Sequence, residues 1–139
     1  MATDVTCALI ESGGKVLAAR RAENADRGGL WEFPGGKVAS GETEAECLRR
    51  EIGEELGIVV DVAQRLQPVL HREPEAKIRL IPYFCTIVQG EPTPLEHERI
   101  LWSGGRELVR LAWCPADIQV VRQYLSERAP DLARELDRD

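Results

Sequence analysis

The stretch between Gly36 and Ile58 constrains this chain more than any other part of the sequence. It follows the pattern G-x5-E-x7-R-E-U-x-E-E-x-G-U, in which U is a bulky aliphatic residue. The pattern fixes nine positions over twenty-three residues, which is too many for a chance match. Its charged members, all lying between two glycines, are Glu42, Arg50, Glu51, Glu54 and Glu55.

The same stretch predicts an amphipathic helix. Thr43 and Glu46 have the spacing of a capping box, which starts a helix. Gly57 is well placed to end that helix in a left-handed conformation. Between these ends an apolar stripe recurs at spacings of three and four residues, as expected for a helix that packs on a core. Its members are Ala45, Leu48, Ile52 and Leu56.

Three carboxylates, Glu51, Glu54 and Glu55, fall within an arc of roughly 100° on a flank of this stripe. Like charges so close destabilise an isolated helix, and a divalent cation would remove the repulsion. Mg²⁺ is the usual cation where phosphate is the other ligand. Gly35 and Gly36 allow a tight loop that brings backbone groups near the same ion. A solvated acidic helix face would explain the glutamates alone, but not the full pattern.

This stretch resembles the Nudix box at every defined position. The resemblance implies Mg²⁺- or Mn²⁺-dependent hydrolysis of a diphosphate bond in a nucleoside diphosphate linked to another moiety. It also implies an α/β fold, the α/β/α sandwich with a mixed β-sheet. Arg50 is then expected to orient the carboxylates, and Glu42 to brace the loop before the helix. The metal ligands implied are Glu51, Glu54, Glu55 and the carbonyl of Gly36.

The composition is that of a single globular domain spanning residues 1–139. Hydrophobic residues make up 43% of the chain and charged residues 30%, which are ordinary values. The net charge of −6 argues against binding to nucleic-acid polymers or anionic membranes, but not against a nucleotide that arrives with metal. The four cysteines lack a C-x-x-C pair, which favours reduced core thiols over a zinc site. With no predicted signal peptide or membrane span, we expect a cytoplasmic monomer or homodimer.

Strand and turn signals flank the predicted helix on both sides. We expect strands, in chain order, over residues 5–11, 15–20, 58–63, 69–72, 77–88 and 100–103. Residues 22–29 are predicted to form a loop, and Pro34 with the two following glycines should break a short aromatic run. The signals over 106–113 are ambiguous.

A second helix is predicted near the end of the chain. Pro115 suits its first turn, and the helix is expected over 116–128. Pro130 should end it, which leaves residues 131–139 as a helical extension or a tail.

The flanks of the box resemble the MutT-type branch of nucleoside triphosphate pyrophosphohydrolases over about residues 4–128. The matching runs are Arg20-Arg21, Leu30-Trp31-Glu32-Phe33-Pro34-Gly35-Gly36-Lys37, Glu96-His97, Trp102 and Pro115-Ala116-Asp117. Within that branch, three of these runs are most similar to bacterial CTP pyrophosphohydrolases, which hydrolyse cytidine and modified-cytidine triphosphates. They are the Glu-His pair, the Ala-Asp-Ile run at 116–118 and the Leu-Trp-Glu-Phe run.

This resemblance implies further site residues. Glu96 matches an additional metal-binding or general-base carboxylate, Lys37 matches a phosphate-side lysine, and Arg21, Phe33 and Asp117 match positions that contact the base. Phe33 could equally pack in the core instead of contacting the base. Asp117, near a helix start, could equally interact with the helix dipole instead.

Two features depart from the 8-oxoguanine-specific MutT enzymes. Those enzymes place an amide residue at the position of Asp117. An ionised carboxylate only accepts hydrogen bonds, which suits the exocyclic amino group of cytosine or adenine. In addition, the arginine that helps hold 8-oxoguanine has no clear counterpart near Lys77. His97 is expected to be structural, because a lone histidine is weak evidence for catalysis.

The sequence therefore predicts Mg²⁺-dependent hydrolysis of (deoxy)nucleoside triphosphates to nucleoside monophosphate and pyrophosphate. The expected substrates are cytidine nucleotides or modified nucleotides. Glu54 or Glu51 could take the proton of the attacking water, with Glu96 as a rival. An 8-oxo-dGTP diphosphatase is one alternative. A hydrolase of ADP-ribose is another, since Pro74 lies sixteen positions after Ile58. A nucleotide-binding module without turnover ranks last, because no carboxylate of the box is missing.

Overall fold

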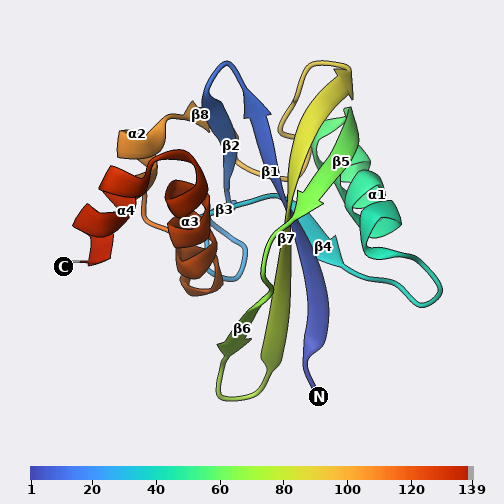
Figure 1. Cartoon of the computed structure of the whole chain (residues 1–139). Helices are drawn as coiled ribbons and strands as arrows, with labels where there is room; N and C mark the ends of the chain where they lie inside the picture. Colours follow the sequence, from blue (N-terminus) through green and yellow to red (C-terminus); the bar gives the residue numbers. More distant parts are fainter. Residues whose placement is uncertain (138–139) are drawn as a thin grey trace.

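The computed structural model of the chain describes residues 1–137, in which strands and helices follow the order shown in Figure 1. The strands are β1 (Thr3–Ser12), β2 (Lys15–Arg20), β3 (Trp31–Glu32), β4 (Gly35–Lys37), β5 (Val59–Arg65), β6 (Val69–Arg72), β7 (Lys77–Gln89) and β8 (Arg99–Ser103). The helices are α1 (Glu44–Leu56), α2 (Gly105–Arg110), α3 (Pro115–Arg128) and α4 (Pro130–Asp137).

A mixed β-sheet forms the centre of the fold. Its main path has the order β3-β2-β1-β7-β5, with β4 paired to β1, β6 to β7 and β8 to β2. The long strands β1 and β7 run parallel, from the pair Thr3 and Ile78 to the pair Ile10 and Cys85. The other pairings between named strands are antiparallel. The predicted mixed sheet is therefore confirmed.

Helices cover both faces of this sheet, with α1 on one side and α2, α3 and α4 on the other (Figure 1). Side chains of β1 alternate between two hydrophobic cores, because successive residues of a strand point to opposite faces. Cys7 and Leu9 belong to the core under α3, while Ala8 and Ile10 belong to the core under α1. The arrangement confirms the predicted α/β/α sandwich.

Helix α1 has the ends that its sequence predicts. The hydroxyl of Thr43 accepts a hydrogen bond from the Glu46 amide at 3.1 Å, and the Thr43 amide donates to the Glu46 carboxylate at 2.8 Å. Gly57 follows the helix with φ of 69°, in the left-handed region. Both caps come from residues adjacent in sequence, so the ends of the helix can be recognised from the local sequence alone.

Three segments differ from the sequence prediction or complete it. Gly35 and Gly36 do not only break the aromatic run but begin strand β4 against β1. A Cβ at Gly35 would lie 2.0 Å from the carbonyl oxygen of Thr6, so only glycine allows this approach. The ambiguous 106–113 stretch contains most of α2, and Pro130 ends α3 but also begins α4. The last part of the predicted extension, residues 138–139, lies outside the described residues.

The four cysteines are free and buried, as predicted for core thiols. Burial raises the pKa of each thiol, to about 12 for Cys85 and Cys114. Over residues 1–137, no helix combines the length and the apolar character that crossing a membrane requires.

Replacing Thr43 with alanine removes the hydroxyl that caps α1. We expect the free energy of unfolding to fall by about 1 kcal/mol, because a helix amide loses its acceptor. Urea denaturation followed by circular dichroism measures this change. Thr93→Ala is the matched control: that hydroxyl is exposed in a loop and bonds only to the nearby Glu91 carbonyl in the described structure. An equal loss in both variants would contradict the capping role.

Candidate active site

One cavity, here called the carboxylate cavity, collects acidic side chains from distant parts of the chain. It has a volume of about 300 Å³. Helix α1 supplies Glu51 and Glu55, the loop between β7 and β8 supplies Glu96 and His97, and β3 supplies Glu32. Its remaining lining residues are Arg21, Ala22, Ala25 and Gly35. Three of the predicted acidic residues are thus brought together.

A second cavity of about 220 Å³, here called the Asp117 cavity, adjoins the first. The two share Arg21, Glu32 and Gly35. The Asp117 cavity lies between β1, β4 and the start of α3, and Phe33 and Asp117 line it. The structure therefore brings together the three residues predicted to contact a base, beside the cavity that holds the glutamates.

Glu55 is the most buried of the clustered carboxylates, with 7% of its side chain exposed. Burial raises its pKa to about 9, and the negative charges of Glu51, Glu32 and Glu96 add to the effect. Without a cation, desolvation and repulsion keep a proton on this group. The donor set of carboxylate oxygens suits Mg²⁺, Mn²⁺ or another hard divalent cation. The residues present therefore fit a divalent metal.

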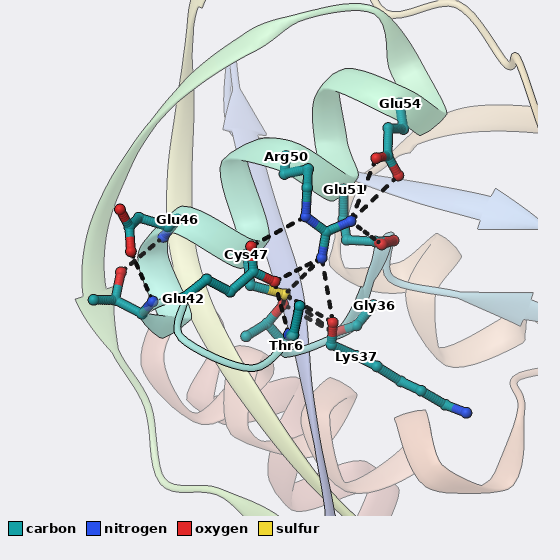
Figure 2. A network of polar contacts seen from close by, with 11 residues as sticks. Thr6, Gly36, Lys37, Glu42, Glu46, Cys47, Arg50, Glu51 and Glu54 are labelled. Atoms are coloured by element: carbon teal, nitrogen blue, oxygen red, sulfur yellow. Dashed lines mark hydrogen bonds and ion pairs between the residues drawn. The ribbon is translucent and has the colours of Figure 1, made fainter.

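Arg50 organises the outer side of α1 (Figure 2). Its Nε and Nη2 donate to the two oxygens of Glu42 at 3.1 and 2.7 Å, a fork that holds the guanidinium. Its Nη1 donates to Glu51 at 2.9 Å and to Glu54 at 3.4 Å. Hydrogen bonds from Arg50 and the Ala39 amide lower the pKa of Glu42 to about 2. Arg50 therefore contacts two of the three predicted metal carboxylates, and Glu42 holds Arg50 in place.

Glu54 and Lys37 lie outside the carboxylate cavity, as judged over residues 1–137. The Glu54 side chain is 52% exposed and faces Arg50. Lys37 is exposed, and its side chain points away from the Arg50 network in Figure 2. A metal role for Glu54 and a phosphate role for Lys37 stay predictions.

The structure turns the Gly36 carbonyl toward β1, and its role as a metal ligand stays a prediction. In the ladder between β1 and β4, Pro34 accepts from the Ala8 amide and Val38 donates to the Asp4 carbonyl. Because bonded pairs alternate in an antiparallel ladder, Gly36 also faces β1. Its carbonyl in addition accepts from the Thr6 hydroxyl at 3.2 Å.

The neighbouring glycine, Gly35, has the opposite orientation in the ladder. Gly35 lies between two bonded pairs of the ladder, so its carbonyl points away from β1. Gly35 also lines the carboxylate cavity. The Gly35 carbonyl is therefore a second candidate for a backbone ligand of a cation in this cavity.

Asp117 is almost completely buried, and its carboxylate accepts a hydrogen bond from the Phe33 amide at 2.9 Å. Burial raises its pKa to about 8, against the opposing effect of this hydrogen bond. Burial therefore favours the protonated carboxyl, which can donate as well as accept, over the ionised acceptor expected from the sequence. The Phe33 ring packs on Trp113 with centroids 4.8 Å apart and also borders the cavity.

Sequence reasoning missed the contacts of Glu32 and His97. Nε2 of His97 lies 2.8 Å from Glu32, and Nη1 of Arg21 donates to the same carboxylate at 3.2 Å. Glu32 and His97 are 65 positions apart, so spacing alone could not pair them. The sequence runs that contain Glu32 and His97 resemble the MutT branch, and this resemblance is the signal that could have pointed to both residues.

Glu32 also lies close to Cys114 and Asp117, with one ligand atom of each within 4.8 Å of the others. These groups already have protein partners, since Asp117 bonds to Phe33 and Glu32 bonds to His97. We therefore assign this cluster to the wall of the Asp117 cavity.

Known proteins share both the domain and the fold described above. The family model described as NUDIX domain matches residues 2–135. The chain belongs to the Nudix family. It is a hydrolase of nucleotide pyrophosphate bonds, and Nudix hydrolases in general use divalent metal ions.

Two relatives are similar over most of their length. The CTP pyrophosphohydrolase of Escherichia coli is 33% identical over 126 residues, which cover 91% of this chain and 93% of that protein. The 8-oxo-dGTP diphosphatase of Haemophilus influenzae is 32% identical over 114 residues, which cover 82% and 84%.

Solved structures support the same branch. The E. coli ORF135 protein matches with a TM-score of 0.81 and 32% identity over 93% of this chain and 92% of that one. The MutT Nudix hydrolase of Burkholderia pseudomallei matches with a TM-score of 0.80 and 29% identity. The match covers 88% of this chain and 98% of that one. These likenesses confirm the predicted MutT-type resemblance.

Replacing Gly36 with alanine should displace a metal carboxylate. The new Cβ would lie 2.2 Å from Oε2 of Glu51, which Arg50 holds from its other oxygen. We expect the dissociation constant for Mn²⁺ to rise at least about tenfold, comparable to losing the support of a metal ligand. An EPR titration of Mn²⁺ measures it.

The matched control is Gly53→Ala in α1, the helix that carries Glu51, where the nearest heavy atom to the new Cβ is the Ile58 carbonyl oxygen at 3.9 Å. It should bind Mn²⁺ as the unmodified chain does. Unchanged binding by Gly36→Ala would show that Glu51 is not a ligand.

Proposed function

We propose that this Nudix hydrolase converts nucleoside and deoxynucleoside triphosphates to monophosphate and pyrophosphate with Mg²⁺, and prefers cytidine or modified cytidine nucleotides. One observation carries the proposal. The carboxylate cavity and the Asp117 cavity adjoin and share Arg21, Glu32 and Gly35. A ligand with a base at one end and phosphates at the other can occupy both.

The carboxylate cavity is suited to the phosphate end of the substrate. Glu51, Glu55 and Glu96, with the Gly35 carbonyl, would hold the cation. When bound, a divalent cation neutralises phosphate charge and lowers the pKa of a bound water. Arg50 holds Glu51 in a fixed orientation, so the carboxylate need not reorganise when substrate arrives.

The general base must be a carboxylate that reaches the attacking water. Glu51 and Glu96 line the carboxylate cavity, whereas Glu54 is half exposed beside it on α1. Arg50 contacts both Glu51 and Glu54. Glu96 lines the cavity and Glu54 does not, which favours Glu96 over Glu54 for this role if Glu51 and Glu55 hold the cation.

The Asp117 cavity is suited to the base. Near pH 7 the Asp117 carboxyl presents an O–H donor, and Glu32 presents carboxylate acceptors in the same cavity. This donor and acceptor complement N3 and the N4 amino group of cytosine. The similarity to the E. coli CTP pyrophosphohydrolase supports the same preference.

8-oxo-dGTP is the second candidate substrate. A protonated Asp117 can donate and accept in the way that an amide does, which removes one argument against an oxidised purine. The Haemophilus influenzae relative carries the name of that activity. ADP-ribose and binding without turnover are left with no specific contact in their favour among the described residues.

A substrate panel with Mg²⁺ tests the proposal through release of pyrophosphate and of phosphate. The panel holds CTP, dCTP, 5-methyl-dCTP, 8-oxo-dGTP, the plain purine triphosphates and ADP-ribose. We expect pyrophosphate release with the highest kcat/KM on the cytidine nucleotides. Glu51→Gln, which keeps the shape of the side chain, is the negative control and should lower kcat by about 10²–10⁴-fold.

The panel also separates the alternatives. A higher kcat/KM on 8-oxo-dGTP would transfer the proposal to the second candidate. Turnover of ADP-ribose alone would contradict the assignment of the Asp117 cavity to a nucleoside triphosphate.

Asp117→Asn should stabilise the protein at high pH only. The folded state keeps a proton on Asp117 up to about pH 8, while the unfolded chain loses it near pH 4. Stability of the unmodified chain therefore falls as pH rises through this window. We expect the variant to be more stable by on the order of 5 kcal/mol at pH 8, with little difference near pH 4.

Urea denaturation at both pH values measures this difference. The amide still accepts from Phe33, so the native contact is kept. Asp61→Asn, at an exposed position of β5, is the control for the change of charge. A difference for Asp117→Asn that does not change with pH would show that the buried carboxyl is ionised.

A further inference from the structure

His97 has one ring nitrogen in use and one without a partner. Nε2 lies 2.8 Å from the Glu32 carboxylate. Nδ1 is buried and makes no hydrogen bond with the described part of the chain. Only 7% of the side chain is exposed. Leaving a buried nitrogen without a partner costs free energy, so a ligand that contacts this atom would stabilise the folded protein.

The unpartnered nitrogen belongs to the carboxylate cavity. His97 lines it together with Glu51, Glu55 and Glu96, and Nδ1 lies 3.9 Å from Oε1 of Glu55. That separation is too long for a hydrogen bond. Two ligands of one cation, each at about 2.1 Å, can be up to about 4.2 Å apart. The two atoms are therefore close enough to share an ion.

The contacts of Glu32 fix the orientation and the tautomer of the ring. Glu32 already accepts hydrogen bonds from Arg21 at 3.2 and 3.4 Å, so it also accepts from His97 and Nε2 carries the hydrogen. In the neutral ring, Nδ1 then has a free lone pair. A histidine that donates one N–H to a carboxylate and turns its other nitrogen to a metal is the usual arrangement of metal-binding histidines.

We propose that Nδ1 of His97 is a nitrogen ligand of the divalent cation bound by Glu55, and that it shifts the preference of the cavity from Mg²⁺ toward Mn²⁺. Imidazole suits transition metals, whereas Mg²⁺ selects oxygen ligands and water. This inference rests on the metal site of the proposed function. It replaces the structural role expected for His97 from the sequence.

Mn²⁺ bound to the full chain without nucleotide tests the proposal by pulsed EPR. A histidine ligand gives a ¹⁴N modulation, and protein made with ¹⁵N-labelled histidine should replace it with that of ¹⁵N. The chain has two histidines. His71 is the matched control, because its Nε2 also contacts a glutamate, Glu73 at 3.3 Å, and it does not line the carboxylate cavity.

We expect the coupling to persist in His71→Gln and to disappear in His97→Gln. In titrations, His97→Gln should bind Mn²⁺ at least about tenfold more weakly, with Mg²⁺ affinity changed much less. If His97→Gln does not fold, labelled His71→Gln gives the answer by itself, because its remaining histidine is His97.

The outcomes separate this inference from the proposed function. Mn²⁺ binding without histidine coupling would overturn the role of His97 and leave the carboxylate site intact. An equal loss of Mn²⁺ and Mg²⁺ affinity in His97→Gln would overturn the shift in preference. Failure of the unmodified chain to bind Mn²⁺ at all would overturn both the inference and the metal site.

Discussion

The crowding of several carboxylates around one cavity, with Glu55 buried among them, is the physical constraint on which the site depends. Glu55 is enclosed beside Glu51, Glu32 and Glu96, and its raised pKa measures how unfavourable a charge is there. Two arginine side chains beside the cluster offset part of this negative charge. Arg50 holds Glu51 from outside and Arg21 holds Glu32 at the boundary between the cavities. The remaining negative charge makes the cavity selective for a cation rather than for another protein group.

What the sequence could predict is local or periodic. The start and end of α1 follow from Thr43, Glu46 and Gly57, which act within a few residues of each other. The glutamates of the box follow from helical spacing, and the expected sandwich follows from the family resemblance. These features needed no knowledge of distant contacts.

What the sequence could not predict depends on register and burial. Whether Gly35 or Gly36 turns its carbonyl to the cavity is decided by the pairing of β4 with β1, which no local pattern fixes. The protonation of Asp117 depends on how deeply α3 is buried against the sheet. The pairing of Glu32 with His97 joins a strand to a loop far away in the sequence.

The burial of the four cysteines has a consequence for the conditions in which the enzyme can work. Peroxide attacks the thiolate, and its access to a thiol depends on exposure. All four thiols here are enclosed, and their raised pKa values keep them protonated. The thiols of this fold are thus poor targets for peroxide. A hydrolase built in this way is expected to keep all four cysteines reduced under oxidising conditions.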